Sequence, residues 1–218
     1  MATKNQINFL ELNKDIIKEP VLIVGSKLYD YDNEDIRKFL INSGFKDITG
    51  IDLFDGEGVD YVLDITDTSS EFITKHKDHY STIICMEILT NVKNPFAAAG
   101  TIIDMLKKGG SALFSECFVR KISKMPIDLW RFTYDGTKQL FSDLEFNDSR
   151  AKISFTRDKD VNLTELVTPF PQLLHDRHKD ESMIGYQLRR IHRRYFSKGI
   201  FKLSRLMPEI TIYSVAKK

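Results

Sequence analysis

The alternation of strand-like and helix-like segments over the first two-thirds of the chain limits its fold more than any other feature. The run PVLIVGS at 20–26 is continuously apolar, as expected for a strand that is buried on both faces of a sheet. Further strands are predicted at 47–54, 59–65, 81–89 and 111–118, and helices at 32–45, 67–80 and 94–110. This order predicts parallel βαβ units and a doubly wound, Rossmann-like α/β sheet.

The last third of the chain has a different pattern. Residues 150–157 and 209–218 are predicted to be two more strands, which brings the mostly parallel sheet to seven. Residues 158–207 are too many for a simple connection, so we expect a helical insertion, or cap, within a single domain of residues 1–218. The stretch 187–206 contains many basic residues and no acidic one. It fits a helix pair packed on the core, or a dock for an anionic acceptor or an anionic membrane.

Charge and composition exclude several classes of function. The 218 residues include 32 basic and 31 acidic ones, and this net charge of +1 argues against a nucleic-acid partner. Two cysteines, Cys85 and Cys117, are too few for a disulfide scaffold and fit a reducing compartment. The amino terminus lacks the apolar core of a secretory signal, and no stretch approaches the roughly 20 apolar residues that cross a bilayer. We therefore expect a cytoplasmic protein.

Three residues mark a candidate ligand site. In a doubly wound sheet, ligands bind outside the carboxyl ends of the strands, where the strand order reverses. Gly25 ends the first predicted strand, and only glycine lets the backbone approach a ligand without a Cβ atom in the way. Asp52 and Asp64 end the second and third strands. At these places a carboxylate can accept hydrogen bonds from ribose hydroxyls, in the case of Asp52, and from an adenine amine, in the case of Asp64. Each residue alone is equally typical of an ordinary turn or loop.

Several short motifs, taken together, are more specific. They are VGS at 24–26, GID at 50–52, GEGVDYVLD at 56–64, EILTNV at 87–92, LKKGG at 106–110 and PIDLWRFT at 126–133. With these motifs the sequence resembles the class I S-adenosylmethionine-dependent methyltransferases over residues 20–145 and the final strand. Within that family it is similar to a bacterial subgroup linked to the modification of surface glycans, which has a P-x-D-x-W-R-F-T motif.

The resemblance implies S-adenosylmethionine as the cofactor and assigns the residues around it. Gly25 and Ser26 would lie against the methionine part, Asp52 would bind the ribose, and Leu53 would contact the adenine ring. Asp64 and the backbone of Ile65 would recognise the edge of the adenine. Cys85, Met86 and Glu87 would lie beside the methyl group, although Cys85 and Met86 fit plain core packing better.

The sequence departs from the family at two positions where a histidine is usual. They are occupied by Asn91 and Ser123. Since histidine is the usual general base near neutral pH, removal of a proton from the acceptor needs another explanation. Three remain open: a carboxylate base, Asp128 or Glu116; a histidine from the insertion, His175 or His178; or an acceptor that is already ionised. In the last case Arg131 would bind the anionic acceptor, unless it braces the loop by pairing with Asp128.

The resemblance therefore predicts methyl transfer to an oxygen of a small-molecule or glycan acceptor, in the biosynthesis of surface polysaccharides. The rival from another class is a non-catalytic domain that retains the fold for binding or assembly. A nucleic-acid methyltransferase is disfavoured by the charge balance. The HDRHKDE stretch at 175–181 is interpreted as a solvated segment, so no metal is predicted.

Overall fold

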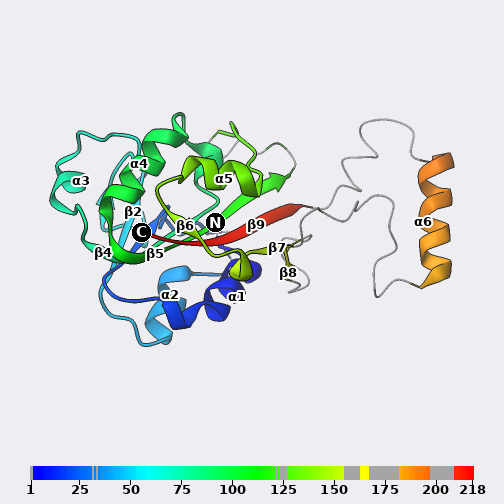
Figure 1. Ribbon diagram of the computed structural model, residues 1–218, viewed down its shortest axis with the longest axis horizontal. Coiled ribbons are helices and arrows are strands. Elements are labelled where there is room, and N and C mark those ends of the chain that lie inside the picture. Colours follow the sequence, from blue (N-terminus) through cyan, green and yellow to red (C-terminus); the bar gives the residue numbers. More distant parts are fainter. Residues whose placement is uncertain are drawn as a thin grey trace.

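A twisted sheet with helices on both faces forms the body of the protein (Figure 1). The computed structural model describes residues 2–30, 32, 34–120, 122, 127–154, 163–166, 182–196 and 209–218. Helices α1 (Lys4–Leu12) and α2 (Ile36–Asn42) cover one face, and α3 (Glu71–Lys75), α4 (Pro95–Met105) and α5 (Tyr134–Leu140) cover the other. Short 3-10 helices are present at η1 (Lys14–Ile16), η2 (Leu89–Asn91) and η3 (Asp148–Arg150).

The strand order confirms the predicted doubly wound sheet. The strands are β1 (Val21–Val24), β2 (Ile48–Asp52), β3 (Tyr61–Val62), β4 (Tyr80–Met86), β5 (Leu106–Val119), β6 (Glu145–Phe146), β7 (Lys152–Ser154), β8 (Thr164–Glu165) and β9 (Ile210–Lys217). They lie in the order β3-β2-β1-β4-β5-β9-β7-β8, and β6 also pairs with β9. Strands β1 to β5 are parallel, whereas β9 runs antiparallel between β5 and β7. The seven expected strands are present, and the two-residue strands β6 and β8 add to them.

Burial on both faces explains why the β1 sequence is apolar throughout. Val21 and Ile23 point into the core formed with α1 and α2, while Leu22 and Val24 point into the core formed with α3 and α4. Alternate residues of a strand face opposite sides of a sheet, so a strand between two helix layers needs apolar residues at every position.

One predicted helix ends earlier than expected. The apolar spacing predicts a helix over 94–110, but α4 ends at Met105 and β5 begins at Leu106. Leu106 is fully buried and pairs with Tyr80, and the next pair is Thr82 with Ser111, so residues 107–110 form a bulge. Gly109, at φ +79°, is in the bulge rather than at a helix end.

Other boundaries also differ from the prediction. Helix α3 is shorter than the expected 67–80, and β3 is shorter than 59–65. In this region Asp64 and Asp67 accept hydrogen bonds from the backbone N–H groups two residues on, at 2.9 and 3.1 Å. Such turns compete with helix and strand pairing. Helix α2 spans less than the predicted 32–45, and α1 and α5 lie in segments where no helix was predicted.

Most of the predicted insertion lies outside the described residues. Its described helix is α6 (Met183–Phe196), which Figure 1 shows apart from the sheet. Among the described helices, none is long and apolar enough to cross a membrane.

Candidate functional site

The reversal of strand order lies between β1 and β4. After β1 the chain continues to β2 on one side, and after β4 it continues to β5 on the other side. The two connections therefore lead away from each other at the carboxyl ends of these neighbouring strands. Gly25 follows β1 and Glu87 follows β4, and they therefore flank the crevice where ligands of doubly wound sheets bind.

The turn after β1 requires glycine. Gly25 has φ +77°, and a Cβ atom placed on it would lie 2.0 Å from Cδ1 of Ile88. The N–H groups of Gly25 and Ser26 both donate to the Ile51 carbonyl, at 2.8 and 3.1 Å. The Ser26 hydroxyl oxygen is buried and has no hydrogen-bond partner within the described part of the chain. This turn can thus bring backbone and one free hydroxyl close to a ligand.

Asp52 is held in one orientation at the end of β2. Its Oδ2 accepts a hydrogen bond from the Lys27 N–H and its Oδ1 accepts one from the Phe54 N–H, both at 3.1 Å. A carboxylate oxygen has two lone pairs, so each still has room for a further donor. Leu53 and Phe54 follow with largely exposed side chains, suited to contact with a flat ring.

The GEGVDYVLD motif secures the neighbouring loop. Asp60 accepts a hydrogen bond from the Gly50 N–H at 2.6 Å and forms an ion pair with Arg37. Gly58 approaches the turn after β1 so closely that a Cβ atom there would lie 2.6 Å from the Ser26 carbonyl oxygen. The glycines and Asp60 therefore hold the turns after β1 and β2 together.

Asp64 follows β3 and is exposed. Its Oδ1 accepts hydrogen bonds from the N–H and the hydroxyl of Thr66, at 2.9 and 2.7 Å. Ile65 is buried in the core, so its side chain anchors this turn. The buried Cys85 and Met86 at the end of β4 belong to the two cores.

Glu87 has a strained backbone and a buried ion pair. Its φ of +55° is unusual for a residue other than glycine, and its N–H donates to the Ser115 carbonyl at 2.6 Å. Its carbonyl accepts a hydrogen bond from the Asn91 side chain at 3.2 Å. Its carboxylate lies 2.9 Å from Nη1 of Arg120 and 3.4 Å from the Thr211 hydroxyl, and only 9% of the Glu87 side chain and 8% of the Arg120 side chain are exposed.

Glu116 lies next to this pair and is 2% exposed. Its Oε1 accepts a hydrogen bond from the Leu89 N–H at 3.2 Å, and its Oε2 is buried with no partner among the described residues. Burial raises the pKa of Glu116 well above its usual range, and the nearby charge of Glu87 raises that pKa further. Burial therefore favours the protonated form of Glu116, which can donate a hydrogen bond from the unpartnered oxygen.

The described part of the PIDLWRFT motif packs against η2. The N–H groups of Leu129 and Trp130 both donate to the Thr90 carbonyl, at 3.0 and 3.2 Å, and the Trp130 indole donates to the Val92 carbonyl at 2.8 Å. The motif therefore closes the carboxyl edge of the sheet beside β4.

Asp128 and Arg131 of this motif pair with each other. Each guanidinium Nη contacts a different carboxylate oxygen, with an Nη2–Oδ2 distance of 2.8 Å, and Arg131 also donates to the Trp130 carbonyl. This geometry is the bracing arrangement; binding of an anionic acceptor by Arg131 would require the pair to open. Ser123, His175 and His178 lie outside the described residues.

Helix α1 brings two buried polar side chains against the sheet, and neither the helix nor these side chains were predicted from the sequence. Thr3 and Gln6 form a capping box at the start of α1, and the Gln6 amide donates to the Ser115 hydroxyl of β5 at 3.1 Å. Both side chains are buried. The T-x-x-Q spacing is the signal that could have predicted this helix.

Comparison with known proteins identifies the family. Residues 34–155, more than half of the chain, match a family described as "Methyltransferase domain". This chain belongs to that family. The matched segment includes Asp52, Asp64, Glu87 and Trp130, and begins after Gly25.

The similarity to individual methyltransferases is more distant. Over 81 residues the sequence is 32% identical to the ubiquinone biosynthesis O-methyltransferase of Saccharophagus degradans. This match covers 31% of this chain and about a third of that protein (33%).

Two solved structures share the fold. A SAM-dependent methyltransferase from Archaeoglobus fulgidus is 14% identical, with a TM-score of 0.56 over 97% of this chain and 92% of that one. The 1,6-didemethyltoxoflavin-N1-methyltransferase of Burkholderia thailandensis, solved with S-adenosylhomocysteine, is 8% identical, with a TM-score of 0.56 over 99% and 77% of the two chains.

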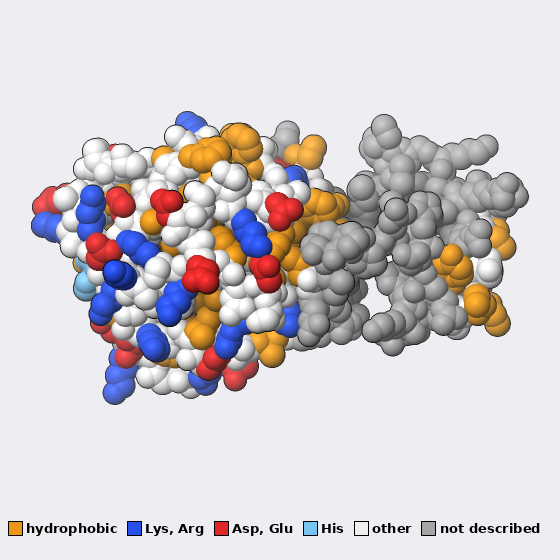
Figure 2. Space-filling model, viewed as in Figure 1, with side chains coloured by type: hydrophobic (Ala, Val, Ile, Leu, Met, Phe, Trp, Pro, Cys, Tyr) orange, Lys and Arg blue, Asp and Glu red, His pale blue; other side chains and the backbone are white. Residues whose placement is uncertain are grey.

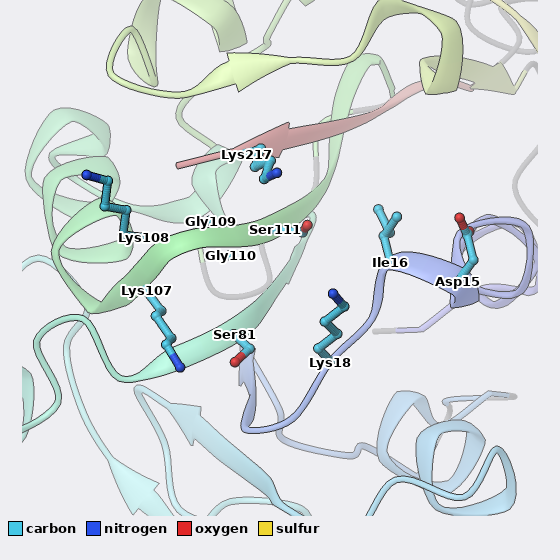
Figure 3. A pocket seen from close by; sticks show the side chains of 10 residues that line it. All are labelled: Asp15, Ile16, Lys18, Ser81, Lys107, Lys108, Gly109, Gly110, Ser111 and Lys217. Atoms are coloured by element: carbon cyan, nitrogen blue, oxygen red, sulfur yellow. The ribbon is translucent and has the colours of Figure 1, made fainter.

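Two further observations concern metal ligands and cavities in the described part of the chain. Within the described ranges, no three His, Cys, Asp or Glu residues are grouped so as to hold a metal ion. A cavity of about 350 Å³ lies at the amino end of β4 and β5, where Lys18, Lys107 and Lys217 surround Ser81 and Ser111 (Figure 3). It is at the opposite edge of the sheet from Asp52, so it is separate from the candidate site.

Proposed function

We propose that the protein binds S-adenosylmethionine at the carboxyl edge of β1, β2 and β4 and transfers its methyl group to an oxygen of a small-molecule or glycan acceptor. The observation that carries this proposal is the oriented Asp52 carboxylate, with an unused lone pair on each oxygen, beside the Gly25 turn at the strand-order reversal. Two neighbouring ribose hydroxyls are the donors that such a carboxylate suits.

The residues present fit this cofactor. The Gly25 turn has no room for a Cβ atom, and the buried Ser26 hydroxyl has no described partner, as expected beside the methionine part. We assign the ribose to Asp52, the adenine ring to Leu53, the adenine edge to Asp64 and the Ile65 backbone, and the surroundings of the methyl group to Met86 and Glu87. The bound cofactor would supply an electrophilic methyl group for an in-line displacement.

The carboxyl groups near the proposed acceptor favour a mechanism in which the acceptor oxygen is positioned rather than deprotonated by the protein. Glu87 and Asp128 are each paired with an arginine, and burial raises the pKa of Glu116, which favours its protonated form. None of the three is thus a free base in this arrangement. Orientation of the acceptor oxygen can itself supply roughly 7–11 kcal/mol of the barrier reduction. Asp128, Glu116 and His175 remain our candidates if a proton must leave, and a role in surface-polysaccharide biosynthesis remains part of the proposal.

Calorimetric titration with S-adenosylmethionine and S-adenosylhomocysteine tests the proposal. Asp52→Ala should weaken S-adenosylhomocysteine binding by about 1.5–3 kcal/mol, because hydrogen bonds to a charged group are lost. Asp55→Ala is the matched control, since Asp55 is an exposed aspartate in the same loop. Equal affinity of the Asp52 variant and the wild type would remove Asp52 from the site.

The second candidate function is a non-catalytic domain with a methyltransferase fold. The paired and protonated carboxyl groups at the acceptor side favour it, as does asparagine at position 91. Failure of the wild type to bind either cofactor form would exclude the methyltransferase activity and leave this alternative. If cofactor binds, transfer of a labelled methyl group to matched neutral and phosphorylated sugars, with wild type and Arg131→Lys, identifies the acceptor class.

A further inference from the structure

Helix α6 exposes a continuous apolar stripe. Ile184, Leu188 and Ile191 recur at the spacing of one helix face, and 75%, 60% and 48% of these residues are exposed. Figure 2 shows hydrophobic side chains at the surface at the end of the molecule where α6 lies. Apolar residues scattered over a surface are ordinary, but a stripe along a helix usually marks an interaction surface.

The remaining positions of α6 make it strongly cationic. Arginine is present at 189, 190, 193 and 194, and the helix contains no acidic residue. At helical spacing, positions 189, 190 and 193 fall on the side opposite the apolar stripe. A short helix with an apolar face, an arginine-rich polar face and low mean hydropathy is typical of helices that lie in a membrane interface.

The charge of α6 favours an anionic membrane over a second copy of the chain as the partner of the apolar stripe. A second copy of α6 would bring eight arginines together with no acidic residue to balance them, which disfavours self-pairing through the stripe. An anionic bilayer provides both the apolar layer for the stripe and the phosphates for the arginines. At 1.5 Å per residue, the 14 residues of α6 are too short to cross a bilayer of about 30 Å, so the helix would lie parallel to the membrane plane.

We propose that α6 docks the protein on anionic membrane surfaces, with Ile184, Leu188 and Ile191 inserted at the level of the headgroups. The docking places the enzyme beside acceptors that are held at a membrane. It is independent of methyl transfer, because α6 shares no residue with the carboxyl edge of the sheet.

Flotation of the full chain with lipid vesicles tests this proposal. Wild type should float with vesicles that contain phosphatidylglycerol at low salt, should be released as salt rises, and should bind vesicles of phosphatidylcholine alone much more weakly. Leu188→Glu/Ile191→Glu should lower the partition coefficient by about tenfold or more, because apolar burial is lost. Arg190→Gln should lower it by roughly fivefold, with a smaller effect at high salt.

The matched control is Leu12→Glu/Ile41→Glu. It introduces the same charges at two apolar residues of α1 and α2 that are similarly exposed, at 58% and 56%. Partition equal to that of the wild type is expected, and thermal melts establish that both double variants are folded. No flotation of the wild type at low salt, or equal loss in both double variants, would overturn the proposal. Self-association without vesicles that Leu188→Glu/Ile191→Glu abolishes would also overturn it, because the stripe would then belong to a second copy.

Discussion

Two glutamates at the carboxyl edge of the sheet should respond in opposite ways to the same substitution. Glu87 forms a buried ion pair with Arg120, whereas Glu116 is buried without a cation of its own, and burial raises its pKa and favours its protonated form. Replacement by glutamine removes the charge of Glu87 but preserves the shape and neutrality of protonated Glu116. We therefore expect Glu87→Gln to be costly at pH 7 and Glu116→Gln to cost no stability there.

The structure sets the size of both effects. Glu87→Gln leaves the Arg120 guanidinium, whose side chain is 8% exposed, without its partner, and a buried charge left alone costs about 3–5 kcal/mol. The lower end is expected, because Glu116 loses a neighbouring negative charge and can then ionise near Arg120. Glu116→Gln retains an oxygen to accept the Leu89 N–H, so a change within about 1 kcal/mol is expected at pH 5, close to the unfolded-state pKa of 4.5.

The pH dependence distinguishes this explanation from simple packing effects. A folded-state pKa above the unfolded value of 4.5 means that protonated Glu116 contributes stability that is complete below about pH 4.5. That contribution is lost as pH rises through the raised folded-state pKa, with a slope of at most about 1.4 kcal/mol per pH unit. Glu116→Gln has no such proton to lose, so it should gain stability relative to wild type as pH rises.

Urea denaturation of wild type, Glu87→Gln and Glu116→Gln from pH 5 to pH 9 measures these differences. Parallel profiles for wild type and Glu116→Gln would refute the neutral-acid assignment. A larger loss for Glu116→Gln than for Glu87→Gln at pH 7 would refute the ion-pair reasoning.

Three further sets of substitutions test the geometry around the site. Gly25→Ala should lose about 1–3 kcal/mol of stability through overpacking, and Ile88→Ala in the same chain should restore part of it, as denaturation midpoints would show. Trp130→Phe removes the indole hydrogen bond and should cost about 0.5–1.5 kcal/mol; an unchanged melting temperature would contradict its structural role. Asp128→Asn, Arg131→Lys and the double variant should show a coupling of about 1 kcal/mol, since the guanidinium is partly exposed; additive effects would mean that the pair contributes nothing.

The sequence predicted the strands and the edge where the acids lie because those features depend on local patterns. A short, uninterrupted apolar run such as that of β1 is typical of a strand that lies between two layers of helices. Gly25, Asp52 and Asp64 then follow strands that were already predicted, and parallel strands bring their carboxyl ends to one edge.

Long-range pairing decided the features that the sequence could not predict. The apolar spacing of α4 continues to Leu106, but pairing of Leu106 with Tyr80 ends the helix at Met105. From the sequence, Arg131 of PIDLWRFT was compatible with binding an anionic ligand or with bracing the loop through Asp128. In the folded protein Arg120 forms an ion pair with Glu87 and Arg131 forms one with Asp128. No local sequence pattern specifies which carboxylate a long cationic side chain meets.

The position of β9 has a consequence for how related chains can differ. This strand lies between β5 and β7, yet residues 155–209 separate it from the end of β7 in sequence. The entropy of closing such a connection grows only with the logarithm of its length, so halving it changes stability by about 0.6 kcal/mol. Chains with this sheet can therefore gain, lose or exchange the segment between β8 and β9 without altering the strand pairing or the turns after β1 and β2. Such changes can accumulate in that segment while the sheet and the candidate site stay fixed.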